Sequence, residues 1–350
     1  MFSLATTILS HPRLPSPAVI APGYLASCSG IFGMLLSEDA ADKVVMETIQ
    51  WPSNRKWATT DREKRVRALF GVSSKMIAII WNKIWESLSQ KEIHSLKKEN
   101  VKFKYLLYAL VFLKVYGTEE IHCSILDWPS AKTFREWSWY FVEKIAGLKR
   151  RTIKLRNRFG GFKIGDEVRT NCFISVDCTD CPIFEPWPFD TKWFSHKTNG
   201  PALKYEVAVC IKTGFIVWIN GPFKASKSDP VIFKEGLSTK LAVDEAVEAD
   251  GVYKISDGPG ARQIKAPDVG WDSKERKAKS CARSRNERVN GKLKVFNVLA
   301  NHFHHMKPRD TMMEKHKRCF HAVAVITQLK MENGELIQDF NYDDYDVNYF

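Results

Sequence analysis

Apolar residues recur at helical spacing through residues 55–147. In residues 73–88 they occupy positions 76, 77, 80, 81, 84 and 88, which share one face of a helix. Ser73 precedes this run, and Thr60 precedes an earlier run that ends at residue 69; both residue types cap helix N-termini. Similar patterns predict helices over residues 105–115, 118–126 and 131–146. We therefore expect an all-helical N-terminal domain over residues 51–148.

A short turn, Phe70-Gly71-Val72, separates the first two of these helices. Helix, glycine-containing turn and helix is the pattern of a helix-turn-helix. In that interpretation the second helix enters a DNA major groove, with Lys75 at its leading end. A plain helical hairpin packed into a bundle explains the same pattern, so the pattern alone leaves both interpretations open.

The pattern changes to short β-type runs after a basic link over residues 149–170. The predicted strands cover residues 172–176, 205–211, 215–219 and 246–249. A helix capped by Asp229 lies between the third and fourth strands, and a long helix follows over residues 273–298. Three strands, a helix, a strand and a late helix is the ribonuclease H arrangement. We therefore predict an α/β (α+β) fold, with a ribonuclease H-like mixed sheet flanked by helices over residues 171–332.

The two ends of the chain differ from the rest in composition. Residues 1–50 are interrupted by Gly and Pro and are expected to form a poorly ordered leader. Residues 333–350 are expected to form an acidic tail. An uninterrupted apolar run of about eighteen residues, as a transmembrane helix needs, is absent, and the leader lacks the compact apolar stretch of a signal peptide.

The overall charge points to a polyanionic partner. The 350 residues carry a formal net charge of +13. The bases are concentrated, with seven and no acid in residues 149–163, and nine against two acids in residues 274–294. Nucleic acid is the commonest polyanion, while a membrane surface calls for an amphipathic basic helix beside an anchor, which the pattern does not show. We therefore expect a DNA-binding protein with no membrane association.

Cysteine usage indicates reduced thiols in an intracellular protein. The eight cysteines follow no repeating frame. Cys178 and Cys181 form a single C-x-x-C, and a structural zinc site needs four ligands. Because no second pair exists, ordinary strand and loop positions are the preferred interpretation of both.

Three acids occupy the positions where the predicted fold brings distant segments together. Asp177 follows the first strand, and Asp250 follows the fourth, with 72 residues between the two aspartates. These two strands are neighbours in a ribonuclease H sheet, and the late helix carries Glu287 across it. Clustered carboxylates stay ionised only with cations between them, and Mg²⁺ or Mn²⁺ prefers oxygen ligands. Asp229 is the alternative second ligand, although an N-cap role also explains it.

The residues around these acids resemble those of the DDE endonuclease superfamily, and most closely its Harbinger-type transposases. Asp177-Cys178-Thr179-Asp180 resembles the family's D-G-T motif, with Cys in place of Gly, and residues 249–253 resemble its D-x-G-Y motif. Thirty-six residues separate Asp250 from Glu287. Arg283, Glu287 and Lys294 fit the R-x3-E-x6-K signature shared with bacterial insertion-sequence transposases, with Ser280 where a Tyr is usual. The resemblance covers residues 170–300.

The resemblance implies a transposase or transposon-derived endonuclease. Such an enzyme cuts and joins DNA through two Mg²⁺ or Mn²⁺ ions, held here by Asp177, Asp250 and Glu287. Residues of the same face of the late helix would flank the metal with cations for phosphates. The residues predicted to contact DNA are Arg283, Lys294, Arg285, Arg288, Lys75 and Lys197.

Two other functions fit the same sequence. A catalytically inactive, domesticated descendant would keep the basic surface and bind DNA without cutting it. A ribonuclease H acting on RNA–DNA hybrids is the third, which the N-terminal helices and the late helical Glu disfavour. The expected partner is double-stranded DNA, with a homo-oligomer and a separate DNA-binding accessory protein left open. In a eukaryote the location would be the nucleus.

Overall fold

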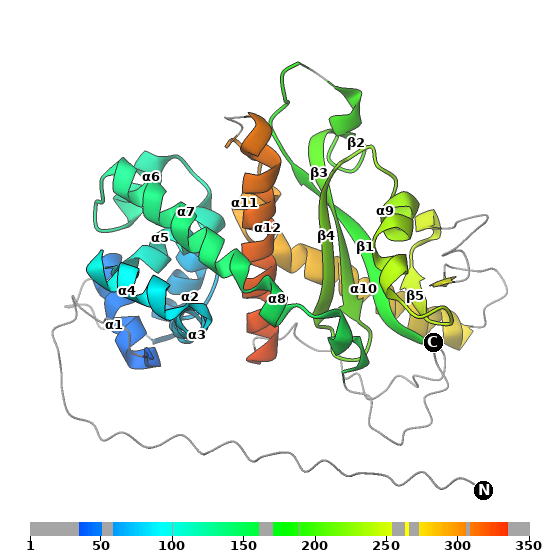
Figure 1. The fold of residues 1–350 in the computed structure, drawn as a ribbon, viewed down its shortest axis with the longest axis horizontal. Coiled ribbons are helices and arrows are strands. Elements are labelled where there is room, and N and C mark those ends of the chain that lie inside the picture. Colours follow the sequence, from blue (N-terminus) through cyan, green and yellow to red (C-terminus); the bar gives the residue numbers. More distant parts are fainter. Residues whose placement is uncertain are drawn as a thin grey trace, which may run out of the picture.

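The computed structural model describes residues 35–50, 59–99, 101–160, 171–188, 190–253, 263–265, 273–305 and 309–334. A group of helices lies on one side, a mixed sheet on the other, and a long helix, α12 (Arg309–Glu332), stands between them (Figure 1). The predicted α/β architecture, with a mixed sheet flanked by helices and an N-terminal helical region, is confirmed.

The helical part forms where the apolar spacing predicted it. Its helices in the described residues are α1 (Glu38–Thr48), α2 (Thr59–Phe70), α3 (Ser74–Ser87), α4 (Gln90–Lys98), α5 (Lys104–Val115), α6 (Glu119–Ile125) and α7 (Ala131–Gly147). The Ser73 hydroxyl accepts a hydrogen bond from the Met76 amide and caps α3, as predicted. Because α2 begins at Thr59, Thr60 lies inside the helix rather than at its cap. Helix α1 lies within the predicted leader, where Val44 and Val45 are buried in the core.

The sheet has the strand order β2-β3-β1-β5-β6, and β4 also pairs with β3, on the edge opposite β1. Its strands are β1 (Cys172–Pro182), β2 (Phe194–Ser195), β3 (Gly200–Cys210), β4 (Ile216–Lys224), β5 (Ala246–Ala249) and β6 (Ile264–Lys265). β1 is central, antiparallel to β3 and parallel to β5. This is the predicted placement of the first and fourth strands side by side.

Several elements differ in length from their predicted bounds. β1 continues past Asp177 to Pro182, because residues up to Pro182 pair with β3, so Asp177 lies mid-strand rather than at a strand end. Helix α9 (Asp229–Glu235) ends before Gly236, and a short 3-10 turn follows over Leu237–Lys240. Its N-cap is Ser228, not Asp229, because the Asp229 carboxylate turns to Lys204 instead.

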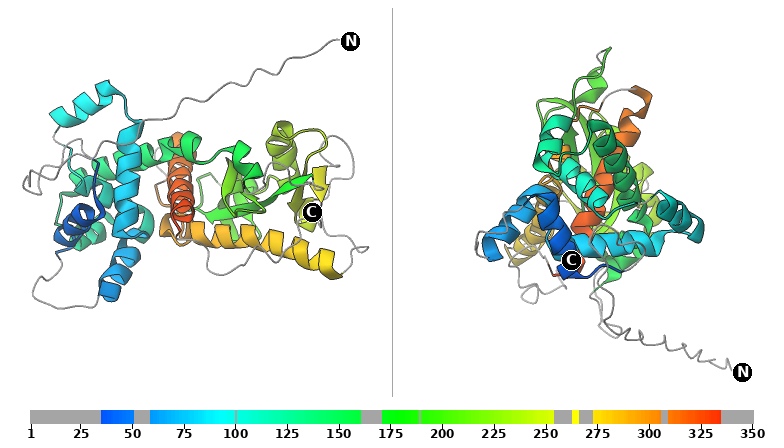
Figure 2. Two further views of the ribbon diagram at one scale, coloured as in Figure 1. Left: turned by 90° about the horizontal axis from the view of Figure 1, so that it is seen from below. Right: turned by 90° about the vertical axis from the view of Figure 1, so that its left-hand side faces the viewer.

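Helices cover both faces of the sheet. Helix α9 packs on one face, over the side chains of Ile174, Val176 and Cys178. Helix α10 (Ser273–Leu293) runs beneath the other face, as Figure 2 shows, and α12 packs beside it over β3 and β4. The short helices α8 (Lys149–Thr152) and α11 (Asn297–Ala300) lie on either side of α12.

Helix α12 gives the helical part and the sheet one continuous apolar core. The rings of Tyr205 on β3 and Phe320 on α12 stack with centroids 3.7 Å apart. The same cluster of buried residues contains Phe141 of α7 and Trp81 of α3. Within the described residues, no helix is both long and apolar enough to cross a membrane.

Candidate active site

Asp177 lies at the centre of the sheet, half-buried beneath α10. Its Oδ1 accepts a hydrogen bond from the Cys178 amide at 2.8 Å. Its Oδ2 accepts one from the Asn290 side-chain amide of α10 at 3.0 Å. Strand and helix therefore hold the same carboxylate in place.

Asp250 is brought beside Asp177 by strand register. Val176 pairs with Ala249 in the parallel β1–β5 ladder, and an aspartate directly follows each of these two residues. Asp177 is still within β1 and lies on the face that α10 covers, while Asp250 is the first residue after the end of β5. Asp250 is exposed, and its carboxylate accepts a hydrogen bond from the Gly251 amide at 2.6 Å.

The charges around Asp177 are incompletely compensated. Burial raises the pKa of its carboxyl, while the Lys197 ammonium and the Cys178 amide act to lower it. The nearby carboxylates of Asp229 and Asp250 raise that pKa further. The net direction is upward, so the folded chain holds this carboxylate at an electrostatic disadvantage.

Lys197 and Lys204 are the lysines nearest to the acids Asp177 and Asp229. The Lys197 ammonium donates to the Cys178 carbonyl oxygen at 3.1 Å. Burial lowers its pKa, but the charges of Asp177, Asp229 and Asp180 outweigh that effect and raise it. Lys204 forms an ion pair with Asp229 at 2.7 Å, and both side chains are buried. Asp229 is thus already neutralised by a lysine.

Three polar contacts fix helix α10 over β1 and β5. Arg283 pairs with the fully buried Glu248 of β5 at 2.8 Å. One turn later, the Asn286 amide donates to the Ser175 hydroxyl at 2.8 Å, and Asn290 then reaches Asp177. The Asn286 and Asn290 contacts advance along β1 from Ser175 to Asp177, and the Arg283 contact ties the helix to the neighbouring strand β5, so together they set the rotation and the register of α10.

These contacts also determine where Glu287 lies. Successive helical residues are rotated by about 100°, so Glu287 sits about 40° beyond Arg283, on the side away from Asn286. Since Asn286 faces β1 and Arg283 faces β5, Glu287 lies toward the β5 side of the helix, the side of Asp250. Its side chain is exposed.

The three predicted ligands are not drawn into one coordination sphere. No three Asp, Glu, His or Cys side chains of the described residues stand close enough together to hold a metal ion. The donor set nevertheless suits a hard cation, because one carboxylate lies in β1, a second directly follows the adjacent strand β5, and the helix over them carries a third. The Asn290 amide oxygen beside Asp177 is buried without a hydrogen-bond partner in the described structure, and amide oxygens are also ligands for such ions.

The three arginines of α10 that were predicted to contact DNA are at least partly buried. Arg283 is occupied by Glu248 and faces the sheet rather than an open phosphate site, because the buried carboxylate needs a cation. Arg285 is buried, Arg288 is half-buried, and Lys294, just beyond the helix, is exposed. Of this group, Lys294 has the exposure that a phosphate contact requires.

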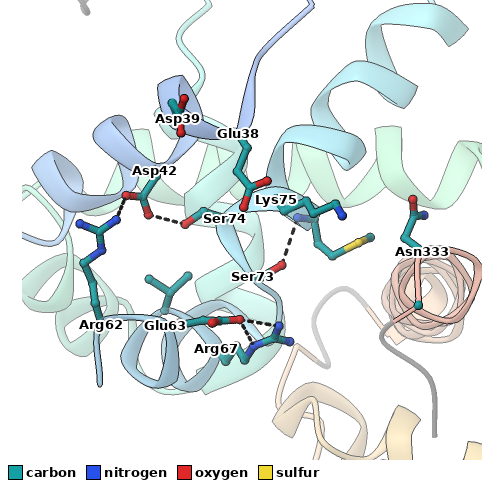
Figure 3. Close-up of a pocket in the computed structure, with 13 residues that line it drawn as sticks. Glu38, Asp39, Asp42, Arg62, Glu63, Arg67, Ser73, Ser74, Lys75 and Asn333 are labelled. Atoms are coloured by element: carbon teal, nitrogen blue, oxygen red, sulfur yellow. Dashed lines mark hydrogen bonds and ion pairs between the residues drawn. The ribbon is translucent and has the colours of Figure 1, made fainter. Parts of the chain in front are cut away.

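Lys75, at the start of α3, lines an acid-rich cavity (Figure 3). This cavity of about 360 Å³ is also lined by Glu38, Asp39, Asp42 and Glu63. Asp42 accepts hydrogen bonds from Arg62 and from the Ser74 hydroxyl. Helix α3 is otherwise mostly buried, exposing Lys75, Lys83 and Glu86. Its role as a DNA-reading helix stays a prediction.

Cys178 and Cys181 lie on opposite faces of the sheet. Cys178 packs in the α9-side cluster and accepts a hydrogen bond from the Tyr253 hydroxyl at 3.2 Å. Cys181 is buried in the core that α10 and α12 cover. Because side chains three residues apart in a strand point to opposite faces, this C-x-x-C cannot close on one metal ion.

Comparison with known proteins supports the interpretation of the sheet-bearing segment. Residues 176–328 match the DDE superfamily endonuclease family. The resemblance to that superfamily, predicted from the motifs, is confirmed, while the Harbinger subtype stays a prediction. A relative described as "Probable transposase for insertion sequence element IS702", from Microchaete diplosiphon, is 29% identical over 141 residues. That match covers 37% of this chain and 49% of the relative, so the chain spans about half the relative's length. No solved structure matches significantly.

Sequence reasoning missed the side chains that join α10 to the sheet. Asn286, Asn290 and Glu248 were passed over in favour of the more numerous bases of the same segment. A signal was present, since Asn286 and Asn290 are four residues apart on one face with Val289 and Leu293 beside them. Polar residues that adjoin the apolar stripe of a helix lie close enough to the sheet to hydrogen-bond with it, as Asn286 and Asn290 do.

Proposed function

We propose that this protein cuts and joins DNA phosphodiester bonds, as a transposase or a transposon-derived endonuclease. The observation that carries the proposal is the register of two adjacent parallel strands, which places Asp177 of β1 level with Asp250, the residue directly after β5, near a helix that carries Glu287 toward the β5 side. The match of residues 176–328 to DDE superfamily endonucleases supports it.

In this proposal Asp177, Asp250 and Glu287 hold two Mg²⁺ or Mn²⁺ ions. When bound, such ions activate water or a 3′-hydroxyl and stabilise the departing oxygen of an in-line phosphoryl displacement. Asn290 and the Cys178 amide keep the Asp177 carboxylate in one orientation. The exposed Glu287 lies where a change of its side-chain rotamer alters its distance to Asp250.

The remaining positive charge near the site serves the DNA. Lys197 is held beside Asp177 through the Cys178 carbonyl, and it is not consumed by a close ion pair in the described structure. We propose that it contacts a phosphate next to the bond that is cut. Double-stranded DNA is the proposed partner, with a nuclear location in a eukaryotic cell.

The decisive experiment is metal-dependent DNA cleavage. Supercoiled plasmid is incubated with the purified full chain and Mn²⁺ or Mg²⁺, and nicked and linear products are measured. Asp177→Asn should reduce the rate by more than about a hundredfold, beyond the 10–100-fold loss expected of an outer-shell partner. Asp244→Asn is the matched control, because Asp244 is an exposed acid before the same strand, β5, that Asp250 follows. Equal rates in the Asp177 variant and the parent would refute the catalytic assignment.

A second candidate is a DNA-binding protein that no longer cuts. The observation favouring it is that, among the described residues, the three acids do not meet at metal-binding distance. The same preparation distinguishes the two functions. Salt-sensitive duplex binding without cleavage in the parent protein supports the inactive descendant, and cleavage that requires Asp177 excludes it.

A further inference from the structure

A cavity of about 700 Å³ lies between the end of α7, the link helix α8, the edge strand β4 and helix α12. Lys149 and Arg150 line it from the link, and His321 lines it from α12. Trp218, Ile219 and Asn220 of β4 form the opposite wall. We call this cavity the basic hollow. None of the described residues that line it is Asp or Glu.

The half-buried Lys149 differs from the other buried cations of the sheet. Arg158 pairs with Glu245, Lys204 with Asp229, and Arg283 with Glu248. The Lys149 ammonium instead donates to the Ile219 carbonyl oxygen at 3.2 Å, and the described structure gives it no carboxylate partner. A cation withdrawn from water without a counter-charge is destabilising unless an anion joins it.

Cations in and around the basic hollow repel one another. Burial, together with the charges of Lys317 and Arg150, lowers the pKa of Lys149 to about 8. Burial and the charges of Lys149 and Lys317 lower the pKa of His321 to about 3. Lys317 also has an exposed ion pair with Glu314, but neither of these two residues lines the hollow. An anion placed there would relieve this repulsion.

The surroundings indicate an extended polyanion rather than a single small anion. The link continues past the hollow with Arg151 and Arg156, both exposed, and no acid occurs in residues 149–163. The Trp218 indole nitrogen is already occupied by Glu206, so its ring offers an apolar wall of the kind a sugar packs against. Several basic side chains that follow a positive cavity along the chain match the repeated negative charge of a nucleic-acid backbone.

We propose that the basic hollow binds a phosphodiester group of the backbone of duplex DNA, through Lys149 and Arg150. This site lies at the β4 edge of the sheet, two strands away from β1 and Asp177. It rests on the proposed function, because it supposes DNA as the substrate. The hollow would hold DNA beside the cleavage site without taking part in the chemistry.

The test measures how duplex binding depends on salt. Lys149→Met with Arg150→Gln removes both charges and keeps most of the side-chain volume. We expect the affinity for a fluorescein-labelled duplex, followed by anisotropy at about 0.1 M salt, to fall at least about tenfold. The slope of log K against log salt should become less steep, by the amount that corresponds to about two lost phosphate contacts. Lys149→Arg, which keeps the charge, should retain the parent slope. Thermal melting confirms that each variant is folded.

The matched control is Lys97→Gln with Lys98→Gln, which removes two exposed charges from the end of α4. An equal loss in both double variants would overturn the proposal, because it would show only a net-charge effect. Inorganic phosphate and a single-stranded RNA are titrated in parallel. Loss of phosphate or RNA binding with unchanged duplex binding also overturns it. If the Lys149 and Arg150 substitutions leave duplex binding unchanged while plasmid cleavage still requires Asp177, this site is wrong and the proposed function stands.

Discussion

In two regions of the molecule, neighbours of like charge shift the pKa of a partly buried group, an acid in the first region and a lysine in the second. Around Asp177 the carboxylates of Asp229 and Asp250 raise its pKa. In the basic hollow, Lys317 and Arg150 help to lower the pKa of Lys149. Other buried charges of the sheet form ion pairs, as Arg158 does with Glu245. The difference suggests that buried like charges mark places built for a counter-ion, a cation in the first region and a phosphate in the second.

The largest expected effect is on DNA cleavage, and it should differ between substitutions of Asp250 and Asp229. Asp250 has no lysine at ion-pair distance in the described structure, whereas Asp229 is neutralised by Lys204. Asp250→Asn should therefore bring Mn²⁺-dependent plasmid cleavage to background, and Asp229→Asn should leave measurable cleavage. If Asp229→Asn abolished cleavage and Asp250→Asn did not, Asp229 would be the second metal ligand despite its ion pair with Lys204.

The next effect is on stability and concerns the ion pair between Arg283 and Glu248. Arg283→Met removes a cation that pairs with the buried Glu248 carboxylate, so we expect a loss of about 3–5 kcal/mol in the free energy of unfolding, measured with urea. Replacing both residues, as Arg283→Met with Glu248→Leu, should recover most of that loss.

A contrasting result should come from the like-charge regions. Neither Asp177→Asn nor Lys149→Met breaks an ion pair, and each removes a repelled charge. Both should keep or raise the melting temperature in metal-free, DNA-free buffer, as expected where function is maintained at the expense of stability. A clear fall in melting temperature for either variant would contradict the comparison.

A smaller effect is expected at the contact between α10 and Asp177. Asn290→Ala removes the amide that orients the Asp177 carboxylate. We expect cleavage or Mn²⁺ affinity to fall about 10–100-fold, the range for an outer-shell partner of a metal ligand. Paramagnetic relaxation of water protons by Mn²⁺ measures the affinity independently of cleavage. Unchanged affinity and rate would place Asn290 in a purely structural role.

The smallest effect concerns a titratable group that is buried neutral, with neither ion pair nor like-charge neighbour. Burial lowers the pKa of His316 to about 3, below the ordinary value of 6.5, and its Nδ1 lies 2.8 Å from the Tyr205 hydroxyl oxygen. The unfolded chain takes up a proton between these values and the folded chain does not. Stability should therefore fall as pH drops below 6.5, by about 2 kcal/mol between pH 6.5 and 5 from this residue. Urea midpoints of the parent and His316→Phe, with His94→Gln as the exposed control, measure the difference.

The sequence predicted the strands that carry the site better than the contacts that support it. The ends of β5 and the spacing to Glu287 came from local pattern and motif, and the β1–β5 neighbourhood followed from element order. The extension of β1 beyond Asp177 did not, because Asp177, Thr179 and Asp180 interrupt the apolar run and only pairing with β3 extends it. Tertiary pairing overrode the local pattern there.

Helix α12 was absent from the predicted elements for a similar reason. Its buried face includes His316 and Gln328, whose polarity hides the apolar stripe. Each has a distant partner, since the Gln328 side-chain oxygen accepts a hydrogen bond from the Ile216 amide of β4 and the His316 Nδ1 lies at hydrogen-bond distance from the Tyr205 hydroxyl. A hydrogen-bond partner more than a hundred residues away cannot be inferred from local periodicity.

The position of α12 between the two parts limits how the molecule can be rearranged. One side of this helix packs on α7 and the other on β3, β4 and α10. A chimera that keeps residues 171–334 but receives a foreign helical part would leave one flank of α12 bare in water. The helical part therefore cannot be exchanged like a domain on a flexible linker. Any partner that it binds is held in a fixed orientation relative to the sheet.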